Sequence, residues 1–81
     1  MRKYLDLWEQ VKSARYLQIN APRKNHRTIA LGIRKESIRD KAFRFLCVNN
    51  GKSYRIYTYS TGDILHVRIE WNDKIPASFT R

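Results

Sequence analysis

Apolar residues recur every three to four positions in the first part of the chain. In residues 3–14, KYLDLWEQVKSA, the positions at this spacing are Tyr4, Leu7 or Trp8, Val11 and Ala14. Such spacing places side chains on one side of a helix. Asp6 and Glu9 fall in the first half of the segment, where the positive end of a helix dipole favours acidic groups. The pattern predicts a helix over residues 3–14.

The pattern changes to alternation in residues 15–20, RYLQIN, which also contain residues that favour β-structure. A half-buried strand has this period of two, so we expect a short strand here. Pro22 should end it, because proline has no N–H group to donate to a sheet.

Two interpretations fit residues 25–41, NHRTIALGIRKESIRDK. The first is a second helix with an apolar strip and ion pairs at helical spacing. Gly32 in its middle costs about 1 kcal/mol relative to alanine. The second interpretation makes residues 28–33, TIALGI, a strand and begins the helix near Lys35. We expect the first, although the second is supported by the spacing of Ile38, Ala42, Phe45 and Leu46.

The last third of the chain predicts an antiparallel meander. Its three β-rich segments are AFRFLCV (42–48), KSYRIYTYS (52–60) and ILHVRIEW (64–71). They are separated by NNG and TGD, which suit hairpin connections because Asn and Gly accept a positive φ. We expect residues from about 72 to 81 to form an irregular tail.

Alternation along these segments assigns two faces to the meander. The side expected to pack against helices carries Phe43, Phe45, Tyr54, Ile56, Val67 and Ile69. The outer side then displays Arg44, Arg55, Tyr57, Tyr59, His66 and Arg68. The predicted fold is α+β, with an antiparallel sheet of about four strands and two helices packed on one face. Residues 1–81 should form a single small domain.

The single cysteine, Cys47, cannot form a disulfide within the chain and sits in an apolar segment, so we expect a buried core thiol. A lone cysteine also suits a reducing, cytoplasmic location. No apolar segment approaches the ~20 residues that a membrane span requires. Asp6 and Glu9 interrupt the start of the chain, which is unlike a signal peptide.

The net charge of the chain is the strongest indication of its function. Seventeen Lys and Arg oppose seven Asp and Glu, which gives a formal net charge of +10. Self-repulsion of this size works against folding, and a protein that needs only solubility does not require it. We therefore expect a polyanionic partner, with nucleic acid favoured over an anionic membrane or an acidic protein.

The positive charge is concentrated between residues 10 and 35, where no acidic residue occurs. This segment contains Lys12, Arg15, Arg23, Lys24, Arg27, Arg34 and Lys35. If the second helix begins near Asn25, then Arg23, Lys24 and Arg27 surround its N-terminus together with His26. Free backbone N–H groups at that end favour a phosphate, whereas cations ordinarily prefer the opposite end. We expect this cluster to contact phosphates.

The outer side of the meander supplies a second candidate surface. Bases of single-stranded nucleic acid stack on tyrosine rings, and guanidinium groups take the phosphates. Tyrosine pairs across strands also stabilise antiparallel sheets without any ligand. The candidate nucleic-acid-binding residues are Lys12, Arg15, Arg23, Lys24, His26, Arg27, Arg34, Lys35, Arg44, Arg55, Tyr57, Tyr59 and Arg68.

Catalytic chemistry is less well supported. One cysteine and two histidines show no metal-ligand spacing, and the three glycines form no phosphate loop, so we expect neither a metal nor a cofactor. A metal-independent ribonuclease needs a proton acceptor, a proton donor and cations, which could come from Arg55, Tyr57, Tyr59, His66 and Arg68. The segment SYRIYTYSTGDILHVRIEW resembles the sheet of RelE-type messenger-cleaving toxins. The predicted strand between the helices departs from that family, and no catalytic motif can be carried over.

The sequence favours a non-enzymatic protein that binds RNA or single-stranded nucleic acid in preference to duplex DNA. No recognition helix is evident, so low sequence specificity is expected. A small basic chain that starts at Met1 suits a phage- or mobile-element-type regulator of host RNA metabolism or of a defence or toxin system. The alternatives are a small RelE-like ribonuclease and a protein-directed inhibitor of a host enzyme. An acidic protein partner and an oligomer both remain compatible with the sequence.

Overall fold

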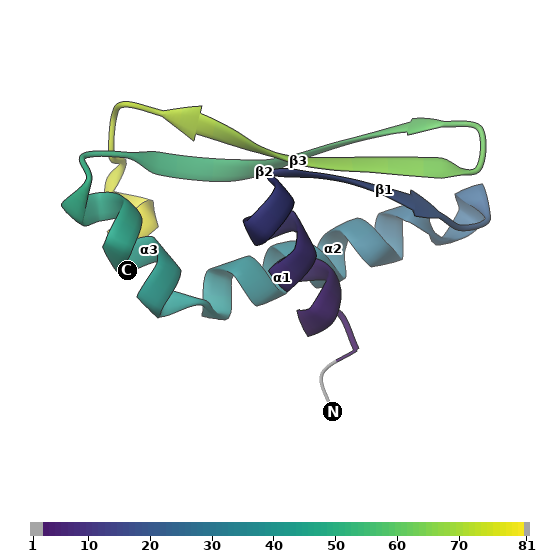
Figure 1. The fold of residues 1–81 in the computed structure, drawn as a ribbon, viewed down its shortest axis with the longest axis horizontal. Coiled ribbons are helices and arrows are strands. Elements are labelled where there is room, and N and C mark those ends of the chain that lie inside the picture. The colour runs from purple at the N-terminus through teal and green to yellow at the C-terminus, as the bar shows by residue number, and fades with distance from the viewer. Residues whose placement is uncertain (1–2, 81) are drawn as a thin grey trace.

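Helices pack against one face of an antiparallel sheet and form the second of two layers (Figure 1). The computed structural model describes residues 3–80. Within these residues the α-helices are α1 (Leu5–Ala14), α2 (His26–Arg39) and α3 (Lys41–Asn49). All of them lie on the same side of the sheet, below it in the view of Figure 1.

The sheet contains β1 (Tyr16–Asn20), β2 (Ser53–Thr61) and β3 (Ile64–Asn72) in the described part of the chain. Its spatial order is β1-β3-β2, so the last strand lies in the centre and pairs with a neighbour on each side. Both pairings are antiparallel. The predicted α+β fold with an antiparallel sheet is therefore confirmed, with three strands in place of about four.

The first half of the chain follows the expected elements. The predicted helix, short strand and second helix correspond to α1, β1 and α2. TIALGI lies inside α2, so the interpretation of residues 28–33 as a strand is wrong. Gly32 faces the ring of Tyr4, and a β-carbon at this position would overlap that ring. The glycine thus weakens the helix locally but lets Tyr4 lie directly against α2.

The segment AFRFLCV is not a strand. It belongs to α3, so the prediction of a strand over residues 42–48 is wrong. NNG ends this helix instead of forming a hairpin: Gly51 adopts φ 74°, and the N–H of Lys52 donates to the carbonyl of Cys47 at 3.0 Å. TGD does join β2 to β3, with Gly62 at φ 58°. Phe45, which was expected in the core, is exposed on α3.

Asp40 separates α2 from α3 and makes the contacts that join the helices. Its Oδ1 accepts a hydrogen bond from the backbone N–H of Phe43 at 3.1 Å and so caps the start of α3. Its Oδ2 accepts from Trp8 Nε1 at 2.9 Å and from Lys12 Nζ at 2.7 Å, both on α1. One carboxylate therefore ties α1 to the junction of the other two helices.

The ionisation of this pair reflects the same contacts. Burial disfavours the charged Asp40 carboxylate, but hydrogen bonds from Lys12, Trp8 and the Phe43 N–H outweigh it and lower the pKa of Asp40. Burial likewise opposes the charged Lys12 ammonium, yet hydrogen bonds to Asp40 and Glu9 raise the pKa of Lys12. Both groups are thus held in their charged forms at neutral pH.

The core lies between the helices and the inner face of the sheet. Its fully buried side chains are Trp8, Val11, Ile33, Leu65 and Val67. Cys47 is also buried, as expected, and burial raises the pKa of its thiol. Tyr54 extends the core toward α3, where its ring packs edge-on against Phe79 with centroids 5.1 Å apart.

The chain beyond β3 returns to the helical layer. A 3₁₀ turn, Ala77–Thr80, places Phe79 in the core next to α3. The guanidinium of Arg44 lies 4.4 Å from the centroid of the Phe79 ring, and its Nη1 donates to the Phe79 carbonyl at 2.7 Å. Arg44 was expected on the outer side of the sheet. That expectation is wrong, because the residue belongs to α3 and fastens the end of the chain.

Replacing the charged cap tests the role of Asp40. We expect Asp40→Asn to lower the free energy of unfolding by about 2 kcal/mol, because charge-assisted hydrogen bonds contribute about 1.5–3 kcal/mol. Urea denaturation followed by circular dichroism measures the change. Glu9→Gln is the matched control: Glu9 also pairs with Lys12 but is half exposed, so a loss below about 0.5 kcal/mol is expected. Equal losses in the two variants would contradict the assignment.

The lowered pKa of Asp40 also predicts an acid dependence. The stability that Asp40 contributes is fully present above its unfolded-state pKa of about 4. It is lost as the pH falls through the lower pKa of the folded state, because the unfolded chain then binds more protons. The difference in unfolding free energy between the wild type and Asp40→Asn should stay constant near neutral pH and narrow in acid. A difference that persists unchanged at about pH 2 would show that the carboxylate charge is not responsible.

Candidate nucleic-acid interface

The second face of the sheet is not covered by any described helix (Figure 1). The strand faces of β2 and β3 follow the predicted alternation: Tyr54, Ile56, Val67 and Ile69 are buried under the sheet. The side chains on the uncovered face are Tyr16 and Gln18 from β1, Arg55, Tyr57 and Tyr59 from β2, and His66, Arg68 and Glu70 from β3. This set is called the sheet face below.

Tyr16, Arg68 and Tyr57 form one row across the three strands of the sheet face. The register places Arg68 directly opposite Tyr16 on one side and Tyr57 on the other. The guanidinium of Arg68 lies 4.8 Å from the centroid of the Tyr57 ring, a cation–π contact. Its Nη2 is also 3.6 Å from a carboxylate oxygen of Glu70.

Gln18, His66 and Tyr59 form the neighbouring row. His66 lies opposite both of the others, and its ring stacks on that of Tyr59 with centroids 4.3 Å apart and planes inclined by 3°. The two rows are two residues apart along each strand, or about 6.6 Å. Aromatic rings on neighbouring rows therefore stand close enough to receive successive bases of one chain.

His66 fixes the position of these rings. It is only 8% exposed, and its Nε2 lies 2.7 Å from Thr61 Oγ1. Its Nδ1 is hydrogen-bonded to the hydroxyl of Tyr16, which also accepts from Gln18 Nε2 at 2.8 Å. Both ring nitrogens are thus engaged, and the His66 ring stacks against the Tyr59 ring of the neighbouring strand.

Tyr16 is a member of the sheet face that the sequence analysis missed. Its ring is 39% exposed, the same fraction as that of Tyr57, and it lies 5.9 Å from the His66 ring in a stacked orientation. Tyr16 and Gln18 are two residues apart in the predicted strand and therefore share one of its sides. Only the pairing of β1 with β3 shows that this side continues the sheet face.

The cations of the sheet face are exposed to solvent. Arg55 donates to Glu70 Oε1 from both Nε and Nη2 at 2.7 Å, and its side chain is 73% exposed. Glu70 is shared between Arg55 and Arg68. Exposed ion pairs contribute only about 0–1 kcal/mol, so either guanidinium can turn toward a phosphate at little cost.

The cluster Arg23, Lys24 and Arg27 lies at one end of the sheet, separate from the sheet face. Arg23 and Lys24 are exposed in a 3₁₀ turn, Arg23–Asn25, and Arg27 is exposed in the first turn of α2. The expected helix start near Asn25 is confirmed. The preceding chain is tied to the β2–β3 turn by the hydrogen bond from Ala21 N–H to the Asp63 carbonyl at 3.0 Å.

His26 does not belong to that exposed cluster. It is buried, its Nε2 donates to the Ala21 carbonyl at 2.8 Å, and its Nδ1 is 2.7 Å from Ser60 Oγ. These contacts join the end of β1 and the start of α2 to β2. Because His26 is only 5% exposed and both of its ring nitrogens have partners, it does not belong to the candidate interface.

Other predicted binding cations have contacts in the helical layer. Lys12 pairs with Asp40, and Arg34 Nη2 donates to Thr58 Oγ1 at 3.3 Å beneath β2. With Arg44, these side chains stabilise the fold on the side away from the sheet face. Arg15 lies over the Trp71 ring, 5.1 Å from its centroid, and Lys35 is exposed on α2. The sheet face retains Arg55, Tyr57, Tyr59 and Arg68 of the predicted set.

Two further observations concern metal sites and membrane-spanning helices among the described residues. In the part of the chain that the structure describes, no three His, Cys, Asp or Glu side chains are grouped to hold a metal ion. None of the described helices is long and apolar enough to cross a membrane. Comparison of the chain with models of protein families, with curated proteins and with solved structures finds no match.

Proposed function

We propose that the protein binds single-stranded nucleic acid, preferably RNA, on the sheet face and without catalysis. The observation that carries the proposal is the pair of adjacent rows, in which tyrosine rings and Arg68 occupy a face that no described helix covers. A role as a small regulator of host RNA metabolism or of a defence or toxin system is part of this proposal and is supported by size and charge.

The rings favour a single strand over a duplex. Bases in a duplex stack on each other, whereas unpaired bases expose their faces to aromatic side chains. Each base stacked on such a ring contributes about 1–3 kcal/mol, with little dependence on base identity. Because Tyr59 is already stacked on the buried His66, little side-chain freedom is lost when a base stacks on its outer side.

The charges fit the same ligand. Arg55 and Arg68 flank the rings, and Arg23, Lys24 and Arg27 extend the positive surface at the end of the sheet. A strand that crosses the rings has cations available beyond them for its phosphates. The net charge of +10 increases the rate of encounter with any polyanion.

A metal-independent ribonuclease is the second candidate, since the sheet face contains His66 beside two hydroxyl groups and Arg68. If His66 transferred the proton, one of its ring nitrogens would have to come within hydrogen-bond reach of the reacting atoms. Both nitrogens of His66 are engaged, and the ring is covered by Tyr59. The geometry therefore favours binding over cleavage.

Removing the rings tests the stacking surface. We expect Tyr57→Ala with Tyr59→Ala to weaken binding of a fluorescent single-stranded RNA at least tenfold, because two stacking contacts of about 1–3 kcal/mol are lost. Fluorescence anisotropy at fixed salt measures the dissociation constant. The double variant Tyr57→Phe with Tyr59→Phe keeps both rings and should bind within about twofold of the wild type.

Two results would overturn the proposal. Equal affinities of the alanine and phenylalanine variants would mean that the rings do not contact bases. Cleavage of a labelled transcript that is abolished by His66→Asn would favour the ribonuclease. Circular dichroism of each variant confirms that the sheet is intact before affinities are compared.

Salt dependence tests the phosphate contacts separately. For a single strand, the slope of log K against log salt is about −0.7 for each phosphate that the protein neutralises. We expect Arg68→Gln to reduce the magnitude of the slope by about 0.7. Lys35→Gln, a change of the same charge on α2, should leave the slope unchanged. Equal effects of the two substitutions would show that only net charge matters.

A further inference from the structure

His66 lies in the middle of a stack of three rings on the sheet face. The Tyr59 ring lies against it with centroids 4.3 Å apart and planes inclined by 3°. The Tyr16 ring is stacked at 5.9 Å with planes inclined by 25°. Because β1 and β2 pair with opposite sides of β3, the two tyrosines flank the imidazole from opposite directions. A cation within about 6 Å of a tyrosine ring is attracted to it, so this position favours a protonated imidazole on both sides.

Both hydrogen-bond partners of the His66 ring are hydroxyl groups. Nδ1 is bonded to the hydroxyl of Tyr16, and Nε2 to that of Thr61. A hydroxyl group can donate a hydrogen bond or accept one. The neutral ring therefore uses one hydroxyl as a donor and the other as an acceptor, whereas the protonated ring donates to both oxygens. Tyr16 then accepts from His66 and from Gln18 together. The ring can gain a proton without losing a hydrogen bond.

The surroundings of His66 oppose this proton in the free protein. The ring is only 8% exposed, and burial disfavours a charged group. Arg68 lies on the same side of β3, two residues or about 6.6 Å along the strand. The titratable groups that flank the ring from the other strands are Tyr16 and Tyr59. Desolvation and the nearby Tyr16 raise the pKa of Tyr59, so its hydroxyl stays neutral in mild acid and at neutral pH.

The nearest carboxylates along the chain do not compensate for Arg68. Asp63 is exposed in the turn between β2 and β3, and Glu70, four residues further along β3, pairs with Arg55 and Arg68. The described helices lie on the other side of the sheet (Figure 1). A phosphate chain on the sheet face would therefore bring negative charge to a ring that otherwise has a positive neighbour. A ligand that favours the protonated ring must itself bind more tightly to the protonated protein.

We propose that His66 makes binding at the sheet face sensitive to pH, so that a single strand is held more tightly in mild acid than at neutral pH. This inference rests on the proposed function and names the regulation of that site. The proton adds one positive charge in the middle of the ring stack, beside the phosphates of a strand whose base stacks on Tyr59. Histidine is the side chain whose charge ordinarily changes between pH 5 and 8.

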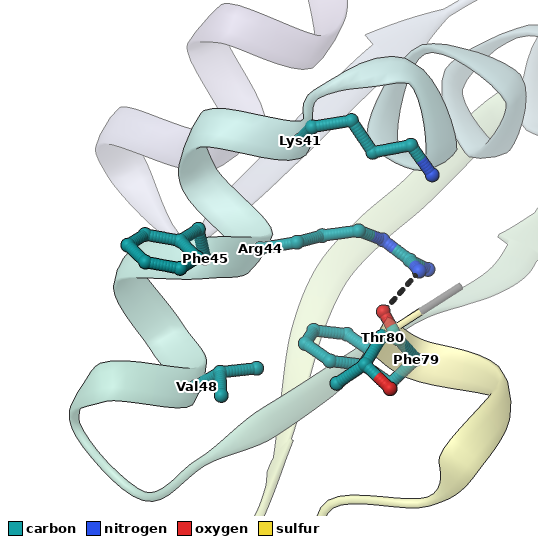
Figure 2. A pocket seen from close by; sticks show the side chains of 6 residues that line it. All are labelled: Lys41, Arg44, Phe45, Val48, Phe79 and Thr80. Carbon is teal, nitrogen blue, oxygen red and sulfur yellow. Dashed lines mark hydrogen bonds between the residues drawn. The ribbon is translucent and has the colours of Figure 1, made fainter.

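Other surfaces do not account for such a response. The second histidine, His26, is buried on the side of the sheet that faces the helices. The hollow of about 350 Å³ between α3 and the end of the chain is lined by Lys41, Arg44, Phe45, Val48, Phe79 and Thr80 (Figure 2). Lysine and arginine keep their charge between pH 5 and 8. A strand bound at that hollow would show no change in affinity over this range.

The test is fluorescence anisotropy with a labelled single-stranded oligouridine, at fixed salt, at about pH 7.5 and about pH 5.5. Uracil neither gains nor loses a proton in this range. We expect the wild type to bind about fivefold more tightly at the lower pH, because one charge is added beside a phosphate. The slope of log K against log salt should grow in magnitude by up to about 0.7, as for one more neutralised phosphate.

Two variants show whether His66 is responsible. His66→Gln keeps a hydrogen-bonding side chain but has no titrating ring, so its affinities at the two pH values should be equal. Glu70→Gln is the matched control, a substitution on the same face of β3 that leaves His66 in place, and it should keep the fivefold ratio. Carboxylates ordinarily titrate near pH 4, below this range.

Nuclear magnetic resonance of the imidazole protons adds a measurement on the unmodified chain, in which His66 and His26 are followed separately. The midpoint of the His66 titration should move to higher pH when oligouridine is bound. Equal wild-type affinities at the two pH values, an unmoved His66 midpoint, or a pH response that persists in His66→Gln would overturn this inference and leave the proposed function standing. Failure of the wild type to bind at either pH would instead overturn the proposed function itself.

Discussion

The carboxylate of Asp40 determines the arrangement of the helical layer. It caps α3 through the Phe43 N–H and accepts hydrogen bonds from Trp8 and Lys12 on α1. Because residues 41–49 form a helix on this side, they do not add a strand to the sheet. The sheet is left with three described strands whose other face is uncovered. Asp40 therefore holds α1 and α3 together in the layer opposite the proposed ligand surface.

Positive charge has different roles in the two layers. Lys12, Arg34 and Arg44 are committed to contacts that stabilise the fold. Arg55 and Arg68 share one carboxylate at an exposed site and can exchange it for a phosphate. The repulsion among the remaining charges lowers the stability of the free protein. We propose that a bound nucleic acid relieves this repulsion, which would stabilise the folded chain by mass action.

Local sequence patterns correctly predicted α1, β1, α2, β2 and β3. The alternation of β2 and β3 identified Tyr57 and Tyr59 on the sheet face, and helical spacing identified α1 and α2. The segment AFRFLCV alternates with aromatic residues and so resembles a strand. The spacing of Ile38, Ala42, Phe45 and Leu46 and the Asp40 cap on the Phe43 N–H are local signals for a helix. The contacts of Asp40 with Lys12 and Trp8, which lie 28 and 32 positions away, add to these signals and cannot be seen in the local sequence.

The candidate site was predictable only in part for the same reason. Tyr16 joins the sheet face through the pairing of β1 with β3, which places it opposite Arg68. His26 lies among basic residues in the sequence, but its side chain points inward and contacts Ser60 and the Ala21 carbonyl. Counting the charged residues of the sequence gives the net charge of the chain. Which cations are free to bind follows from tertiary contacts.

The proposed binding of nucleic acid on the sheet face is tested most directly by nuclear magnetic resonance. Backbone amide shifts of the isotope-labelled full chain are followed during titration with a single-stranded oligouridine. If the sheet face binds the strand, the largest changes fall at Tyr16, at Tyr57 and Tyr59, and at His66 and Arg68, with smaller changes near Arg23 and Arg27. Changes centred on α3, or changes confined to the cluster at the start of α2, would contradict binding on the sheet face.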